Sequence, residues 1–417
     1  MQVIASREAL AAGEKGFRIS FEDFPVVATQ HTRSVSSPVT DSAAAATAMA
    51  CGARTINGYL GVTPEGSNLV SIANVAHDHG WKVGLLTSQS MDHATPAGFY
   101  AHTTNRRDYA AISGQLAETR FDFIGGGALR GRFGDKKKAQ GGMPKADGAP
   151  GEDYLASCAS NGYLVVKSRE ALIHIAPTSR VFAVTDKVLP KFEPAVRTRN
   201  GEGMRLRDFT EAALNHFGDS PFFLMVEGGQ IDSACHNNDL GTMVREVEDF
   251  DDSVRVALDY AKNHSDVLIV VTADHETGGL ERIVPAPAGL QPKVLLGQTE
   301  DGPSIFSTLA PLAHVKAPFN DAKKALDLFF GDSAFTEKEI ESLRALWETK
   351  YDALAFCMEA ARCFAARAGF VFTAGSSHTG EDVPVFAFGA GAKMFEGVYD
   401  NSSIFNRFKK LIDMSSR

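Results

Sequence analysis

Residues 222–236 read FFLMVEGGQIDSACH, and this stretch decides the fold class. The apolar run at 222–226 has the length of a buried strand, and Glu227 closes it. The glycine pair that follows permits a tight turn, and Asp232 and His236 are then spaced as i and i+4, which places both side chains on one face of a helical turn. A strand that passes through a glycine turn into a helix is the unit from which α/β sheets are built.

The same stretch suggests chemistry, and two interpretations are open. A carboxylate and an imidazole on one helical face can share a zinc ion. An Asp–His pair at the start of a surface helix would have the same spacing without any metal. The carboxylate of Glu227 at the end of the strand favours the metal interpretation, because ligands in open α/β sheets bind at the carboxyl ends of strands.

Outward from this stretch, short apolar runs alternate with helical patterns, as in a βαβ sheet. The predicted strands are residues 83–87, 121–124, 181–185, 222–227, 267–272 and 383–389. Apolar residues with helical spacing predict a helix over 244–261, and Thr336 with Glu339 forms a capping-box pattern that opens a helix to about Lys350. Residues 285–319 are rich in Pro and Gly and predict an insertion that returns near His378. The Lys-rich segment 130–151 is either a solvated loop or a phosphate-binding patch.

Composition limits the function further. The chain has 417 residues, 44% of them hydrophobic, and a net charge of -9, which argues against a general nucleic-acid binder. No apolar run is long enough to span a bilayer, and no signal peptide is visible at the N-terminus. Five cysteines without a CxxC motif predict thiols rather than a disulfide framework, although a Cys357–Cys363 bridge stays open.

Four more segments carry candidate chemistry. Ser42 precedes an alanine-rich helix, where it is either an N-cap or an anion-facing group. Asp274 and His275 end the strongly apolar run at 267–272, and leaving them unpaired near a core would be costly. Two further groups are candidates. His378 precedes the predicted strand 383–389, and a group of polar residues follows the predicted strand 83–87: His93, Thr95 and Arg106. An arginine there could hold two phosphate oxygens.

Each signal is weak alone, but TDSAAAATA, HATPAGFYAHTTNR, VEGGQIDSACH, TADHETGG and SSHTGEDVPVFAFG occur in this order. The ordered set resembles the alkaline phosphatases over nearly the whole chain. The resemblance implies an α/β fold, a three-layer α/β/α sandwich with a large, mostly parallel central sheet and a crown-like insertion. It also implies one catalytic domain over residues 1–417, with the insertion at about 285–370.

The resemblance further implies a metal-dependent phosphomonoester hydrolase with two Zn²⁺ ions and one Mg²⁺ ion. By motif position, Ser42 is the nucleophile that forms a phosphoserine, and Arg106 binds the phosphate. The implied metal residues are Asp232, His236 and His378 for the first zinc, Asp274 and His275 with Ser42 or phosphate for the second zinc, Glu227 and Thr95 for magnesium, and His93 for the magnesium water shell.

One family feature has no counterpart in this sequence. The family opens with a strand that ends in Gly-Asp-Gly, whose aspartate bridges the second zinc and the magnesium, whereas Met1–Arg7 resembles the helix that follows that motif. We therefore expect that the given sequence begins just after the missing aspartate. We also expect this chain as it stands to have weak activity at best and to be less stable than a complete homologue.

Two rival functions are retained. One is a phosphodiesterase or sulfatase of the same superfamily, although Ser42 in place of a sulfatase-type cysteine argues against the latter. The other is a non-catalytic metal- or phosphate-binding relic. The resemblance also implies small-molecule phosphomonoester substrates, a homodimer, and a periplasmic or secreted location.

Overall fold

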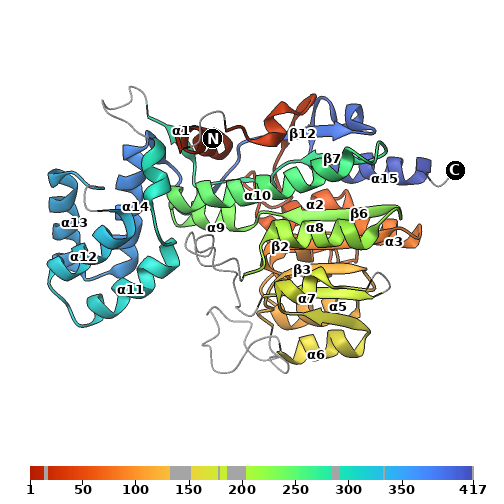
Figure 1. Cartoon of the computed structure of the whole chain (residues 1–417), viewed down its shortest axis with the longest axis horizontal. Coiled ribbons are helices and arrows are strands. Elements are labelled where there is room, and N and C mark those ends of the chain that lie inside the picture. Colours follow the sequence, from red (N-terminus) through yellow and green to blue (C-terminus); the bar gives the residue numbers. More distant parts are fainter. Residues whose placement is uncertain are drawn as a thin grey trace.

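The computed structural model describes residues 1–13, 17–131, 152–176, 179–185, 203–283, 292–331 and 334–415 (Figure 1). Most of the Lys-rich segment 130–151 and the first residues of the predicted insertion at 285–319 lie outside the described residues. A five-stranded sheet, parallel throughout, has the strand order β4, β5, β3, β2, β6. Its strands are β2 (Lys82–Ser90), β3 (Phe123–Gly127), β4 (Tyr163–Val166), β5 (Arg180–Val184) and β6 (Phe222–Glu227).

A second sheet has four strands in the order β13, β1, β12, β7. They are β1 (Val26–His31), β7 (Leu268–Val271), β12 (Val383–Gly389) and β13 (Val398–Asp400). β12 is antiparallel to β1 and to β7, while β1 and β13 are parallel. Two short ladders complete the described strands: β8 (Glu276–Thr277) with β11 (His378–Thr379), and β9 (Leu280–Arg282) with β10 (Phe370–Phe372).

Side chains of the five-stranded sheet alternate between two cores, one on each face. On one face, Leu86 and Phe123 pack with residues of α8 (Leu206–Phe217). On the other, Leu85 and Ile124 pack with residues of the helices α3 (Ile72–Asp78), α5 (Tyr109–Glu118) and α6 (Glu152–Ser160). This alternation is what the period of a strand dictates when both faces are covered. The predicted α/β fold with a mostly parallel sheet is therefore confirmed.

The six predicted strands are all present: β6 and β12 have the predicted boundaries, and those of β2, β3, β5 and β7 are shifted by up to three residues. The helix predicted over 244–261 is part of α10 (Leu240–Ala261). α13 (Glu337–Lys350) begins with the predicted capping box, in which Thr336 and Glu339 satisfy each other's backbone N–H groups. The remaining described helices are α1 (Gln2–Gly13), α2 (Ser42–Cys51), α4 (Ala94–Ala97), α7 (Arg169–Ile173), α9 (Gln230–His236), α11 (Gly302–His314), α12 (Phe319–Phe330), α14 (Ala353–Arg367), α15 (Ser403–Ser415) and three 3₁₀ turns, η1 (Ser20–Asp23), η2 (Pro292–Gly297) and η3 (Ala392–Phe395).

Helices α11 to α14 lie together beyond one end of the sheets, at the left of Figure 1. Their interior includes Phe319, Trp347, Phe356 and Phe364, each at most 1% exposed. The Trp347 indole N–H donates to the carbonyl of Ala317 at 2.8 Å, so its polar atom is satisfied inside this core. These four aromatic residues lie within the predicted insertion at about 285–370. That this insertion is similar to the crown of the family stays a prediction.

No helix in the described ranges combines the length and apolar character that a bilayer crossing requires. All five cysteines are free thiols, so the open question of a Cys357–Cys363 bridge is answered in favour of thiols.

Gly98 lets α4 pack closely on α2, the helix that carries Ser42. A Cβ at Gly98 would lie 2.7 Å from Ala46 Cβ and 3.1 Å from the Ala46 carbonyl carbon. Because backbone atoms of α2 form part of this contact, they cannot move away from the added Cβ as a flexible side chain could. We expect Gly98→Ala to lower the free energy of unfolding by about 1–3 kcal/mol, measured as a lower midpoint of urea unfolding. Gly297→Ala is the control, since nothing lies within 4 Å of its added Cβ; equal midpoints for the two variants would contradict the prediction.

Candidate metal and phosphate site

The candidate site begins at the N-terminus of α2. Asp41 is the N-cap of this helix, and its carboxylate accepts a hydrogen bond from the Ala44 N–H at 3.0 Å. The alternative that Ser42 serves as the N-cap is therefore wrong. Ser42 is instead the first helical residue, 3% exposed, and its Oγ lies 2.9 Å from His275 Nε2.

Helix α9, the segment after β7 and the start of β11 bring carboxylates and histidines to this hydroxyl. Ligand atoms of Asp232, His275 and His378 lie within 4.8 Å of one another. Asp274 Oδ2 lies 3.1 Å from His275 Nε2. His236 Nε2 lies 3.3 Å from Asp232 Oδ2 and 3.2 Å from His378 Nε2. The structure thus gathers five of the metal residues expected from the resemblance around Ser42.

The hydrogen bonds of His236 and His378 indicate a place for a cation. His236 Nδ1 lies 2.7 Å from the carbonyl of Ser376, and His378 Nδ1 lies 2.9 Å from the carbonyl of Thr40. A carbonyl only accepts, so each Nδ1 carries a hydrogen. Burial lowers the pKa of His236, but its hydrogen bond to Asp232 raises that pKa overall, so without a metal His236 Nε2 donates to Asp232. Loss of that hydrogen would leave a lone pair on each Nε2, with the two atoms 3.2 Å apart. A metal ion would use both lone pairs, and Nδ1–H donation to a carbonyl is the usual support for a histidine ligand.

Buried carboxylates give the same indication. Burial raises the pKa of Asp232, but the hydrogen bond from His236 and the nearby His275 outweigh it and lower that pKa overall. The pKa of Asp274 is also lowered, because His275 outweighs burial there. Burial lowers the pKa of His275, yet Asp274 and Asp232 raise it to about 9. These shifts describe ion pairs in which positive charge on His275 offsets the two carboxylates, and a bound cation would take over that role.

Glu227 lies beside this cluster at the end of β6. Burial raises its pKa to about 7, and the carboxylates of Asp274 and Asp232 add to that rise. Thr87 donates a hydrogen bond to Glu227 Oε2, and Thr95 also hydrogen-bonds this side chain. Thr87 was not identified from the sequence as a site residue, although its position at the end of an apolar run was a usable signal.

Arg106 reaches the site by way of Asp41 and His93. Its Nη1 donates to Asp41 Oδ2 at 3.0 Å, and its Nη2 lies 3.4 Å from His93 Nε2. Burial, Arg106 and Arg130 lower the pKa of His93 to about 3, so this ring is neutral. Its Nδ1 is buried and has no hydrogen-bond partner among the described residues, which leaves that atom for a water molecule. Asp41 thus links the serine helix to the arginine, a role that the sequence did not reveal.

Arg130 is a second guanidinium near the site that sequence reasoning missed. Its Nη2 donates to Gln89 Oε1 at 3.2 Å, and Gln89 Nε2 donates to Ser233 Oγ at 2.5 Å. Ser233 follows Asp232 directly. This chain of contacts holds the first turn of α9 and adds positive charge on the side of His93.

Comparisons with known proteins show which family this chain resembles in sequence and fold. The family model described as alkaline phosphatase matches residues 5–414. Alkaline phosphatase 3 of Bacillus subtilis is 32% identical over 386 residues, which cover 89% of this chain and 77% of that protein. The solved cold-active alkaline phosphatase from Shewanella sp. superposes with a TM-score of 0.80 at 26% identity, covering 99% of this chain and 96% of its own. A TAB5 alkaline phosphatase variant with Mg bound in its M3 site matches with a TM-score of 0.66 at 25% identity, over 98% and 94% of the two chains.

Proposed function

The chain belongs to the alkaline phosphatase family, and from this premise we propose that it hydrolyses phosphomonoesters through a phosphoserine intermediate on Ser42. One observation carries the proposal. The Ser42 hydroxyl lies at a helix N-terminus and 2.9 Å from His275 Nε2, within a cluster of histidines and carboxylates. A serine in this position has an activating environment on one side and an anion-binding helix end on the other.

In the proposed reaction, Ser42 Oγ attacks phosphorus and the ester P–O bond breaks, so the organic group leaves as an alcohol after it gains a proton. Water then attacks phosphorus, the bond between phosphorus and Ser42 Oγ breaks, and a proton from the water restores the Ser42 hydroxyl as inorganic phosphate leaves. Arg106 binds the non-bridging oxygens with its forked guanidinium, which Asp41 holds in place. The free N–H groups of the first turn of α2 favour the same negative charge.

The side chains of this cluster fit metal ions. The Nε2 atoms of His236 and His378 are 3.2 Å apart, and ligand atoms of Asp232, His275 and His378 lie within 4.8 Å of one another. Asp232, His236 and His378 would hold one zinc, Asp274 and His275 would hold a second zinc beside Ser42, and Glu227 with Thr95 would hold magnesium, with His93 in its water shell. When bound, such ions supply Lewis-acid stabilisation of the attacking and leaving oxygens. The protein's own part is to orient these ligands through Thr40, Ser376 and Thr87.

The assay is p-nitrophenyl phosphate hydrolysis at alkaline pH by the purified chain supplied with zinc and magnesium. The proposal predicts turnover that a chelator abolishes and that the two metals restore. Faster hydrolysis of bis-p-nitrophenyl phosphate would instead favour the phosphodiesterase. Bound zinc without turnover of either ester would favour the relic and contradict the proposal.

The proposed role of Arg106 in phosphate binding can be tested with its neighbour Arg107 as a control. Arg106→Ala is expected to raise the inhibition constant of inorganic phosphate about 10- to 100-fold, because two charge-assisted hydrogen bonds are lost. The measurement is competitive inhibition of p-nitrophenyl phosphate hydrolysis. Arg107→Ala is the control, since Arg107 is exposed and is expected to leave the constant within about twofold. Equal effects of the two substitutions would show that Arg106 does not bind the phosphate.

Family membership is also the basis for two smaller proposals, a homodimer and a periplasmic or secreted location. Light scattering on the purified chain tests the first. Fractionation of cells of the source organism tests the second.

A further inference from the structure

One buried hydroxyl lies between two of the proposed zinc ligands. Thr277 Oγ1 is 2.6 Å from Asp232 Oδ1 and 3.1 Å from His275 Nδ1. The residue is 4% exposed, so water does not compete freely for these contacts. None of the roles proposed above belongs to Thr277, although it touches one ligand of each zinc ion.

The chemistry of the three groups fixes the direction of both hydrogen bonds. As a metal ligand, Asp232 is a carboxylate, which only accepts, so the single hydrogen of the Thr277 hydroxyl is donated to Oδ1. The same hydroxyl oxygen then accepts from the Nδ1–H of His275. With its hydrogen on Nδ1, a neutral His275 keeps its lone pair on Nε2, the atom that lies 2.9 Å from Ser42 Oγ.

The backbone holds Thr277 in place for this task. In the ladder of β8 and β11, Thr277 is directly opposite His378. The Gly278 N–H extends this link, because it donates to the carbonyl of Ser377 at 2.9 Å. Threonine is also branched at Cβ, which restricts its rotamers. The position of the hydroxyl is therefore set by the fold rather than by the groups that it contacts.

Thr277 is in this way connected to all three residues whose ligand atoms lie closest together. Ligand atoms of Asp232, His275 and His378 lie within 4.8 Å of one another. The rings of His275 and His378 are stacked, with centroids 3.6 Å apart. Asp232 and His378 belong to the proposed first zinc, and His275 belongs to the second.

We propose that Thr277 is a positioning residue for the zinc ligands, whose hydroxyl holds Asp232 and His275 in the orientations that bind metal. The inference rests on the proposed function, because it takes these two side chains as zinc ligands. Without the hydroxyl, Asp232 Oδ1 loses a donor and His275 Nδ1 loses its acceptor, so both side chains can turn away from the ions. Losing such a support typically weakens metal binding by about 10- to 100-fold.

The test is titration of the full, metal-free chain with zinc in competition with a chromophoric chelator. Thr277→Val replaces the hydroxyl by a methyl group and keeps the branched shape, and each zinc dissociation constant is expected to rise about 10- to 100-fold. Thr277→Ser removes the methyl group and keeps the hydroxyl, so it is expected to stay within about threefold of the parent. Thr277→Ala removes both groups and is expected to behave like Thr277→Val, which keeps the test decisive if the valine variant does not fold.

Thr210→Val is the matched control. Thr210 lies on α8, is 1% exposed, and donates its hydroxyl to the carbonyl of Leu206 at 2.8 Å. The control therefore removes an equally buried hydroxyl that does not contact a proposed ligand. Its zinc dissociation constants are expected to stay within about twofold of the parent.

The outcomes separate the positioning role from the proposed function. Weak zinc binding in Thr277→Val and Thr277→Ala, with binding close to the parent in Thr277→Ser and Thr210→Val, supports the role. Unchanged affinity in the valine or alanine variant, or equal weakening in the serine variant, overturns the role and leaves the phosphatase proposal standing. A parent chain that binds no zinc overturns the metal-dependent function, and the role with it.

Discussion

Replacing Ser42 by alanine is expected to lower kcat for p-nitrophenyl phosphate by about a thousandfold or more. The variant loses the only atom that can form the phosphoserine, and loss of a nucleophile typically has an effect of at least this size. The small alanine side chain suits the start of α2, where Asp41 rather than Ser42 is the cap. We therefore expect an unchanged thermal midpoint.

The control for this variant is Ser67→Ala, because Ser67 is exposed and lies in a different loop. It is expected to retain kcat within about twofold. If Ser42→Ala retained more than a tenth of the parent kcat, a direct attack by water would explain the turnover better than a phosphoserine.

Replacing Asp232 by asparagine is expected to have the second large effect, on zinc content and on kcat/KM. Its carboxylate lies within reach of His236, His275 and His378, and it also accepts a hydrogen bond from Thr277 at 2.6 Å. Asp232→Asn keeps the shape of the side chain but removes its charge, and a neutral amide is a poor zinc ligand. We expect the loss of about one zinc ion per chain and a decrease in kcat/KM of about a thousandfold.

Zinc content by atomic emission and kcat/KM are both measured after dialysis against a low concentration of zinc. Asp259→Asn removes an exposed carboxylate on α10 and should change neither quantity. A normal zinc content in Asp232→Asn would show that this carboxylate is not a metal ligand.

Four of the five strands of the parallel sheet (β2, β3, β5 and β6) were predicted, because parallel strands buried on both faces are continuous apolar runs. β4, with four residues, was not predicted. β6 and β12 have the predicted boundaries. β1 was not predicted, since VVATQH has only two strongly apolar residues, both valine, and alternates between buried and more exposed positions. α11 was not predicted either, because Pro303 and Pro311 interrupt its pattern; the first lies in the opening turn, where proline is tolerated.

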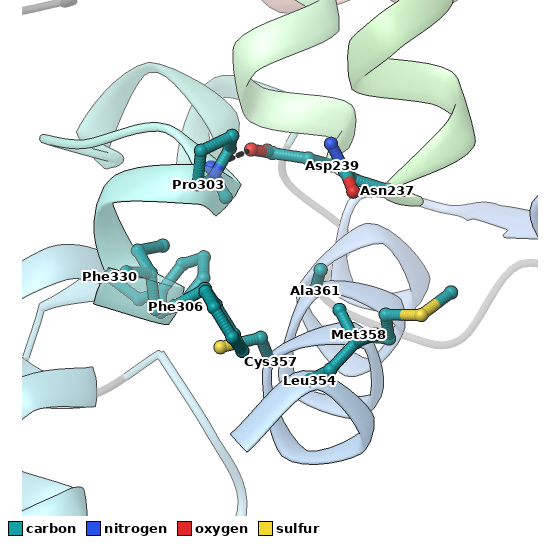
Figure 2. Close-up of a pocket in the computed structure, with 11 residues that line it drawn as sticks. Asn237, Asp239, Pro303, Phe306, Phe330, Leu354, Cys357, Met358 and Ala361 are labelled. Atoms are coloured by element: carbon teal, nitrogen blue, oxygen red, sulfur yellow. Dashed lines mark hydrogen bonds between the residues drawn. The ribbon is translucent and has the colours of Figure 1, made fainter. Parts of the chain in front are cut away.

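The candidate site was predicted from ordered motifs, and the structure brings those residues together. What the sequence did not reveal were the supporting contacts, since each joins residues far apart in the chain. Thr40 supports His378 across 338 positions, and Asp41 holds Arg106 across 65. A cavity lined by residues of α11, α12, α14 and the segment between α9 and α10 (Figure 2) was likewise hidden from the sequence, because some of these segments are far apart in the chain.

The central claim is that Ser42 carries the phosphoryl group during turnover. The most direct measurement is acid quenching of the enzyme, with zinc and magnesium, during hydrolysis of a phosphomonoester, followed by peptide mass spectrometry. We predict a phosphoryl group on the peptide that contains Ser42, absent from Ser42→Ala and after chelation of the metals. Steady turnover with no phosphoryl group on that peptide, or with one on a different residue, would contradict the claim.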